Sequence, residues 1–234
     1  MHDCASLAEQ YGERVARELN IPVFLYEEAA RTPERKNLAN VRKGEYEGLP
    51  EKLKDPAWRP DFGAPVFNER SGATITGARV FLIAYNVNLK TNDKEIAHQI
   101  ALSIRESGRS IKNPDGTTTK MPGTLKAVKA MGVLLERANI SQVSMNLTNF
   151  HVTPPHAAFE EVRQQAEKLG TSVTGSEVVG LIPKEALLMA GTFYSPEQGG
   201  ATDEKRLIDL AAERLGLSQL DTFDPAKKII EYMI

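Results

Sequence analysis

The stretch DFGAPVFNERSGATITGARVFLIAYNVNL, from Asp61 to Leu89, joins a glycine-rich loop to a strand. Up to Arg79 it is rich in glycine, proline, asparagine and serine, which set the backbone dihedrals of turns. From Val80 to Leu89 it is almost unbroken β-branched, aromatic and aliphatic residues, typical of a strand buried on both faces. Such a loop exposes backbone N–H groups that suit a small anionic or amide-bearing ligand. The residues alone favour a simpler interpretation, a domain linker before the first strand of a new domain.

The chain after this strand predicts an α+β domain. A helix, a hairpin of two strands, a second helix and a last strand follow in order: 93–107, 128–136 with 140–147, 156–169 and 172–181. With Val80–Leu89 in front, the order is β-α-β-β-α-β, the split unit of the ferredoxin-like fold, which closes as a four-stranded antiparallel sheet with both helices on one face. Residues 108–123 are expected to form a polar loop. The final third, from Lys184, is expected to be helical, with breaks at Ser195–Gly200 and Asp224-Pro225.

The chain before Asp61 predicts part of a related α/β unit. An amphipathic helix that starts almost at Met1, with apolar residues at helical spacing from Leu7 to Leu19, leads into a short buried strand, Ile21–Tyr26. We expect this strand to lack its usual sheet neighbours, which favours association. Residues 27–54 are highly charged and are expected to be helical. Their Arg and Lys side chains form either a solvated helix face or a basic wall for a polyanionic tail. Trp58 either stacks on a ligand or plugs a core, and base rates favour the core.

Composition excludes several classes of protein. With 29 Lys+Arg against 31 Asp+Glu, the formal net charge of -2 gives no indication of a nucleic-acid or anionic membrane partner. The single cysteine, Cys4, excludes an intrachain disulfide and a cysteine-rich metal site. No apolar run approaches membrane-spanning length, and residues near Met1 do not resemble a signal sequence, so a cytoplasmic protein is expected.

Local motifs give few candidates for catalysis. The four histidines form no metal-spaced pair on a helix face: His2, His98, His151 and His156. Glu177 is a carboxylate inside an apolar strand, where it needs a partner or lines a cleft, and the two interpretations are about even. Asn86 and Asn88 fall on one strand face, because strand side chains repeat with period two, and suit edge solvation or ligand recognition.

Long motifs in order resemble a known family. IPVFLYEEAARTPERKNLANVRKGEYEGL, DPAWRPDFGAPVFNERSGATITGARVFLIAYNVNL, QVSMNLTNF and GSEVVGLIPKEALL are similar to glutamate formimidoyltransferases, over essentially the whole chain. The resemblance implies transfer of a formimino group from N-formimino-L-glutamate to tetrahydrofolate, in histidine degradation and one-carbon metabolism. It implies two ferredoxin-like subdomains with folate in the cleft between them. Residues 1–79 then correspond to part of the N-terminal subdomain, with the folate loop, and residues 80–234 to the C-terminal one.

The resemblance also implies which residues bind folate. The family's folate segment corresponds to part of the glycine-rich loop, namely Gly63, Ala64, Pro65, Val66, Phe67, Asn68, Glu69, Arg70, Ser71 and Gly72. Tetrahydrofolate is the expected co-substrate, and no metal is expected. The family's catalytic histidine belongs to an HPR-type motif upstream of the LYEEAA strand. This sequence has no such motif, so we expect none of its residues to be the catalytic histidine.

Three functions follow as alternatives. The first is the transferase itself, with folate and formiminoglutamate as its partners. The second is an inactive folate-binding or regulatory fragment. The third is a structural subdomain that complements a separate chain carrying the first half of the N-terminal subdomain. We expect either a homodimer or such a complementing chain.

Overall fold

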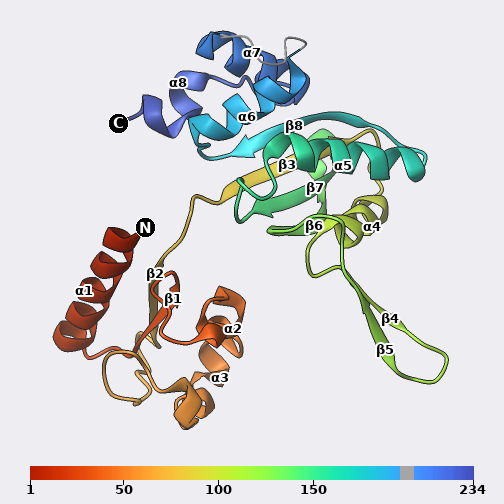
Figure 1. Cartoon of the computed structure of the whole chain (residues 1–234). Helices are drawn as coiled ribbons and strands as arrows, with labels where there is room; N and C mark the ends of the chain where they lie inside the picture. The colour runs from red at the N-terminus through yellow and green to blue at the C-terminus, as the bar shows by residue number, and fades with distance from the viewer. Residues whose placement is uncertain (196–202) are drawn as a thin grey trace. The chain divides into compact units, whose positions relative to one another are not determined.

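The computed structural model describes residues 1–195 and 203–234. These residues divide into two compact units, Met1–Val80 and Phe81–Ile234 (Figure 1). Each unit has buried hydrophobic clusters of its own, and each is described here by itself.

The second unit is built on one four-stranded sheet (Figure 1). Its strands lie in the order β6-β7-β3-β8 and all pair antiparallel: β3 is Ile83–Leu89, β6 Val128–Leu135, β7 Ile140–Leu147 and β8 Val173–Val179. Helix α4, Lys94–Ile104, follows β3, and helix α5, Pro155–Lys168, precedes β8. The α+β class and the predicted β-α-β-β-α-β order are confirmed, although β3 begins three residues later than expected.

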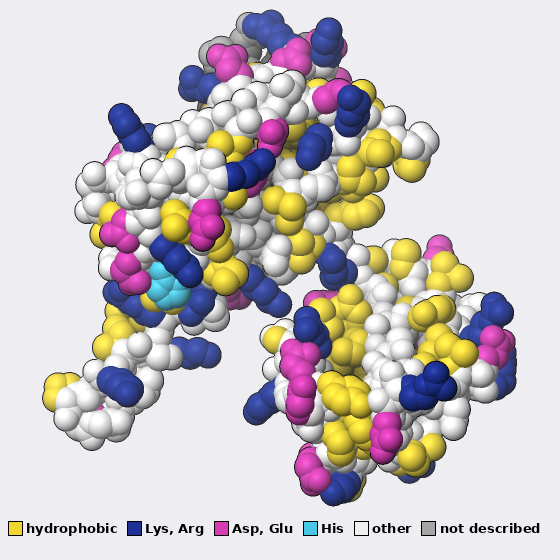
Figure 2. Space-filling view, turned by 180° about the vertical axis from the view of Figure 1, so that it is seen from behind, with side chains coloured by type: hydrophobic (Ala, Val, Ile, Leu, Met, Phe, Trp, Pro, Cys, Tyr) yellow, Lys and Arg dark blue, Asp and Glu magenta, His cyan; other side chains and the backbone are white. Residues whose placement is uncertain are grey.

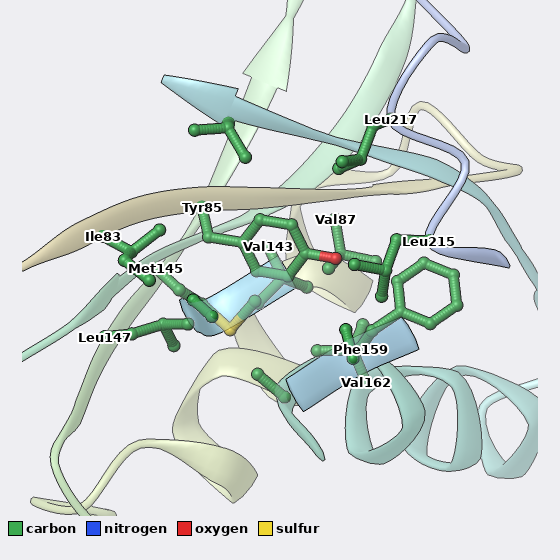
Figure 3. Close-up of a cluster of buried hydrophobic side chains, with 14 of the residues drawn as sticks. Ile83, Tyr85, Val87, Val143, Met145, Leu147, Phe159, Val162, Leu215 and Leu217 are labelled. Carbon is green, nitrogen blue, oxygen red and sulfur yellow. The ribbon is translucent and has the colours of Figure 1, made fainter. Parts of the chain in front are cut away.

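Helices α4 and α5 contact each other and the sheet, so they cover the same face. Residues Ile83, Tyr85, Val87 and Leu89 alternate along β3 and are fully buried. Figure 3 shows the side chains of Ile83, Tyr85 and Val87 with those of β7, on the side of the sheet where Phe159 and Val162 of α5 lie. The core therefore lies between this face of the sheet and the two helices.

Tyr85 carries the one hydroxyl of this strand into the core. Its Oη donates to Ser176 Oγ at 2.8 Å, and Ser176 Oγ donates to the carbonyl of Leu215 at 2.6 Å. Burial raises the pKa of the Tyr85 hydroxyl well above its usual value. The two hydrogen bonds satisfy this buried group and tie β8 to the segment after helix α7, Glu204–Arg214.

The predicted polar loop over residues 108–123 is wrong in part, because it contains a β-hairpin. Strands β4, Arg109–Lys112, and β5, Thr118–Met121, pair antiparallel and are exposed along their whole length. Gly116 has φ +81° at the turn. Asp-Gly between two short runs is a hairpin signal, which the polar composition of the segment obscured.

In the described residues of the final third, the helices are α6 (Lys184–Tyr194), α7 (Glu204–Arg214) and α8 (Pro225–Lys228), with a 3-10 turn at Ile230–Tyr232. Helix α6 contacts α5 and α7. The predicted break at Asp224-Pro225 is the start of α8, with Asp224 accepting from Ala226 N. The predicted break at Ser195–Gly200 lies, beyond Ser195, outside the described residues.

The first unit holds a two-stranded parallel sheet, β1 (Val23–Glu27) with β2 (Thr74–Ala78). Its helices are α1 (His2–Leu19), α2 (Leu38–Arg42) and α3 (Glu45–Lys52), with short 3-10 turns at Pro33–Arg35 and Pro56–Trp58. Strand β1 begins two residues later than predicted. Within the described residues it pairs in a sheet only with β2.

Strand β2 corrects the prediction that residues 61–79 form a loop throughout. Gly77 suggested a turn, yet it pairs with Tyr26 inside the sheet. A Cβ at Gly77 would lie 2.2 Å from the Tyr26 carbonyl oxygen. The glycine therefore permits a close approach of two backbones, the other meaning of glycine in a strand.

Charged side chains of both signs lie on the face of the protein shown in Figure 2. On the face shown in Figure 2, Lys and Arg side chains are interspersed with Asp and Glu over each unit. Among the described residues, no helix combines the length and the apolar character that a membrane span needs.

Gly132 on β6 gives a test of this packing. A Cβ there would lie 2.3 Å from the backbone N of His98, so Gly132→Ala must push α4 away from the sheet. We expect the free energy of unfolding to fall by about 1–3 kcal/mol, measured by urea denaturation with circular dichroism. Gly48→Ala on α3 is the control, since no atom lies within 4 Å of its Cβ position, and it should not destabilise. Equal midpoints for the two variants would contradict the close packing of α4 on β6.

Candidate functional site

The predicted loop Gly63–Gly72 lies in the first unit and is fixed at its start by Asp61. The Asp61 side chain is only 3% exposed. Its Oδ2 accepts from Leu25 N at 2.8 Å and from Arg35 Nη1 at 2.6 Å. The backbone of Asp61 also donates to Val23 O at 2.9 Å. Val23 and Leu25 both belong to β1, so these hydrogen bonds fix Asp61 against that strand. The loop that follows Asp61 therefore starts from a defined point.

Arg35 is the buried partner of Asp61. Its Nη2 donates to the carbonyls of Ala57 and Arg59, at 3.3 Å and 2.7 Å. Its guanidinium also lies 5.7 Å from the ring centroid of Trp58. The Asp61 carboxylate and the two carbonyls compensate the buried guanidinium, because an unpaired charge is costly in a protein interior. Trp58 packs against the buried cluster of Phe24, Val41, Leu49 and Leu53, which agrees with the core interpretation that base rates favoured.

A closed turn forms the end of the loop. Asn68 Oδ1 accepts from the backbone N of Arg70 and of Ser71, both at 3.0 Å, and Gly72 N donates to Asn68 O at 2.7 Å. Gly72 has φ +62°, a conformation that glycine adopts without strain. The sequence Asn-x-x-Ser-Gly thus makes its own turn through the asparagine side chain.

The middle of the loop is exposed. Gly63, Ala64, Pro65 and Val66 are all solvent-accessible. In the part of the chain that the structure describes, the backbone N–H groups of Gly63, Ala64 and Val66 donate to no protein group. Free N–H groups on a loop held at both ends can bind an oxygen of a ligand with little loss of backbone freedom.

A cavity of about 300 Å³ lies beside the end of the loop. Ser71 and Gly72 form part of its lining, and Phe24, Leu49 and Ile75 give it an apolar wall. Pockets of this size, mostly apolar with a few polar groups, are typical of small-molecule sites.

Charged side chains from α2 and α3 complete the lining. Arg42 pairs with Glu45 at 3.3 Å and is largely exposed. Lys52 Nζ donates to the carbonyls of Asn40 and Lys43, at 3.1 Å and 3.0 Å, and burial lowers the pKa of its ammonium group. Lys52 is therefore occupied in holding the end of α2, whereas Arg42 can turn toward an anion.

Tyr46 connects α3 to the loop. Its Oη donates to the carbonyl of Glu69 at 2.6 Å, and its ring centroid lies 5.2 Å from that of Phe67. Tyr46 also lines the cavity. Tyr46 and Arg42 were not predicted as site residues. Their only signal in the sequence is the charged run of residues 27–54, for which a basic wall was one of two open interpretations.

Only part of the predicted folate loop lies at the cavity. Ser71 and Gly72 line the cavity, and Asn68, Glu69 and Arg70 build the turn beside it. Gly63 has φ +84°, and a Cβ there would lie 3.1 Å from Ile21 O and 3.4 Å from Ala16 Cβ on α1. Pro65 and Val66 are exposed and take no part in the cavity lining.

The second unit holds Glu177, for which sequence left two interpretations open. Asn86 Nδ2 donates to Glu177 Oε1 at 3.0 Å, and Gln142 Nε2 donates to the same oxygen at 2.9 Å. Asn86 lies directly opposite Glu177 in the sheet. The structure thus shows a partner for the carboxylate, and the predicted shared face of Asn86 and Asn88 is confirmed.

The histidines lie apart from these groups. His2 opens α1 and His98 lies on α4. His151 Nδ1 is 3.7 Å from Glu185 Oε1. The ring of His156 stacks on Phe193, and burial lowers the pKa of its imidazole. No group of three or more potential metal-ligating side chains occurs among the described residues.

Comparison with known proteins gives the family. The model of the formiminotransferase domain, N-terminal subdomain, matches residues 1–79, and that of the formiminotransferase domain matches residues 84–234. Similar proteins include the glutamate formimidoyltransferase of Streptococcus pyogenes serotype M1, 45% identical over 192 residues, with 82% of this chain and 60% of the relative covered. That of Thermoplasma acidophilum is 41% identical over 216 residues, covering 92% and 66%.

A longer relative shows how much of such a protein the chain represents. It is 49% identical over 235 residues to the formimidoyltransferase-cyclodeaminase of Gallus gallus, with 100% of this chain and 42% of the relative covered. The chain thus spans about two fifths of the length of that relative. The two family models together leave only residues 80–83 unmatched. The chain belongs to the formiminotransferase family.

Proposed function

We propose that the protein takes part in transfer of the formimino group of N-formimino-L-glutamate to tetrahydrofolate, a step of histidine degradation and one-carbon metabolism. The observation that carries the proposal is the pair of formiminotransferase models that match residues 1–79 and 84–234. We assign 1–79 to the N-terminal subdomain, with its folate loop, and 80–234 to the C-terminal subdomain.

The reaction joins a ring amine of tetrahydrofolate to the amidine carbon of the donor. A new C–N bond forms, the C–N bond to glutamate breaks, and the proton leaving the folate amine ends on the glutamate nitrogen. No electrons are transferred to or from another reagent. The protein must hold two flexible anionic substrates together and move one proton.

The loop and cavity of the first unit fit the folate part of this task. Free backbone N–H groups at Gly63, Ala64 and Val66 can donate to oxygens of the ligand. The apolar wall of the cavity suits an aromatic ring, and Arg42 beside it suits a carboxylate of the folate tail. We therefore propose tetrahydrofolate as the ligand of Gly63–Gly72 and the adjoining cavity.

Replacing Gly72 by valine tests this assignment. A β-branched side chain at φ +62° is strained, and its Cβ would lie 3.2 Å from the Tyr46 ring. We expect the affinity for tetrahydrofolate, measured by calorimetry, to fall about tenfold or more. Gly170→Val is the control, because Gly170 has φ +74° and no atom within 4 Å of its Cβ position. Unchanged affinity in Gly72→Val, or no binding by the unmodified chain, would reject the loop as the folate site.

The catalytic step gives a second prediction. The 234 residues include no histidine in an HPR-type motif. Loss of general acid–base help costs about a hundred- to ten-thousand-fold in rate, so we expect this polypeptide by itself to show formimino transfer at background level in a coupled assay.

The same assay separates the alternatives. Turnover that appears when a segment carrying the HPR-type motif is added as a separate chain would favour the complementing subdomain. Folate binding without turnover in either case would favour the inactive folate-binding fragment. Full turnover by the polypeptide alone would contradict the prediction. In that case, loss of activity in His151→Gln or His156→Gln would identify the residue responsible.

A further inference from the structure

One face of the sheet in the second unit carries a row of side chains, three of them polar, that the core does not use. Met131, Ser144, Asn86 and Glu177 stand side by side across the four strands, in register. They alternate with the buried residues that pack on α4 and α5, so they point to the opposite face. Met131 is 58% exposed, and Asn86 and Glu177 are partly buried. This row, called here the carboxylate row, is reachable from solvent.

A chain of amides orients the carboxylate of this row. Gln142 Nε2 donates both to Asn88 Oδ1, at 2.6 Å, and to Glu177 Oε1, at 2.9 Å. Asn88 Nδ2 in turn donates to Gln219 Oε1. Asn88 is fully buried and Gln142 is 2% exposed. The orientation of each amide is therefore fixed by the next, from Gln219 through to Glu177.

The anchor of this chain is itself tightly placed. Gln219 lies on the segment after α7, which packs directly on β8 at Gly175. A Cβ at Gly175 would lie 2.5 Å from Gln219 Cβ and 2.7 Å from the Gly216 carbonyl oxygen. The absence of a side chain at Gly175 thus allows Gln219 to reach Asn88. The close packing at Gly175 and the hydrogen bond from Asn88 together hold Gln219 in place.

Both donors to Glu177 meet the same oxygen. Oε1 receives Asn86 and Gln142, which fills its two lone-pair directions. Oε2 accepts no hydrogen bond within the described part of the chain. A carboxylate kept only to satisfy Asn86 and Gln142 could be replaced by a neutral acceptor without the cost of partly burying a charge. The arrangement instead keeps one charged oxygen oriented and free.

We propose that Glu177 Oε2 binds the cationic amidinium group of the formimino donor. This inference rests on the proposed function, since it names the subsite for one of its substrates. A formimino group on an amine is an amidine, which carries a positive charge and N–H donors when protonated. Those donors form charge-assisted hydrogen bonds to a carboxylate, as a guanidinium does. Glu177 is on this assignment a substrate-binding residue, and Asn86 and Gln142 are its positioning residues.

The charge of the ligand gives the sharpest test. N-formimino-L-glutamate and N-formyl-L-glutamate share their carboxylates and differ in one group, a cationic amidinium against a neutral amide. Titrations of the full chain, followed by the side-chain NH₂ signals of Asn86 and Gln142 in NMR, give the dissociation constant of each ligand. We expect the formimino compound to bind on the order of tenfold more tightly and to shift both signals.

Glu177→Gln removes the charge and keeps an oxygen that can accept from Asn86 and Gln142. We expect the preference for the formimino compound to fall to about one in this variant. Glu161→Gln is the matched control, because Glu161 Oε1 likewise accepts from two neutral donors, Thr124 and Gln165, but lies on α5. It should keep the full preference. Thermal unfolding of each variant shows whether the fold is retained.

The outcomes are distinct. A preference that survives Glu177→Gln, or no preference in the unmodified chain, would overturn the assignment. So would signal changes at Asn86 and Gln142 on adding tetrahydrofolate but not on adding the formimino compound. Loss of stability in Glu177→Gln with an unchanged preference would show a purely structural role. The comparison of the formimino and formyl compounds uses neither folate nor turnover, so a failed folate assay leaves it able to support or reject the subsite.

Discussion

The alternation of side chains along the central strand β3 is the constraint on which the second unit depends. Strand β3 pairs with β7 on one side and with β8 on the other, so a shift of one residue would move every side chain to the other face. Tyr85 and Val87 would then face solvent, and Asn86 and Asn88 would enter the core under α4 and α5. The apolar core therefore fixes the register that places Asn86 beside Glu177. Packing on one face and polar chemistry on the other follow from the same pairing.

The first unit depends on a different interaction, the buried pair of Asp61 and Arg35. Such pairs cost desolvation free energy, and apolar replacements are often as stable. Here the pair does something that an apolar contact would not do. Asp61 bonds to the backbone of β1, and Arg35 bonds to the carbonyls of Ala57 and Arg59. These directional hydrogen bonds therefore fix where the loop leaves the sheet. They also fix the start of the segment that carries the backbone N–H groups of Gly63, Ala64 and Val66.

Much of the second unit could be predicted because its signals are local. Apolar runs marked the strands, and helical periodicity marked α4 and α5. The prediction failed where a glycine had two meanings. Gly77 suggested a turn but allows close backbone contact in β2, and Gly116 was not recognised as a hairpin turn. The cavity could not be predicted, because Arg42 and Tyr46 meet the loop only through the folded chain, and a charged run has the same sequence whether it is solvated or lines a pocket.

The two candidate sites differ in the sign of the charge that they favour. The loop offers backbone N–H groups, with Arg42 at the neighbouring cavity, and so favours oxygens and carboxylates. The carboxylate row offers one free oxygen of Glu177 and so favours a cation. Folate carries an anionic tail, whereas a protonated formimino group is cationic. The two units therefore present binding groups of opposite charge. On the proposed function, the loop and Arg42 would meet a carboxylate of the folate tail, and Glu177 would meet the cationic formimino group.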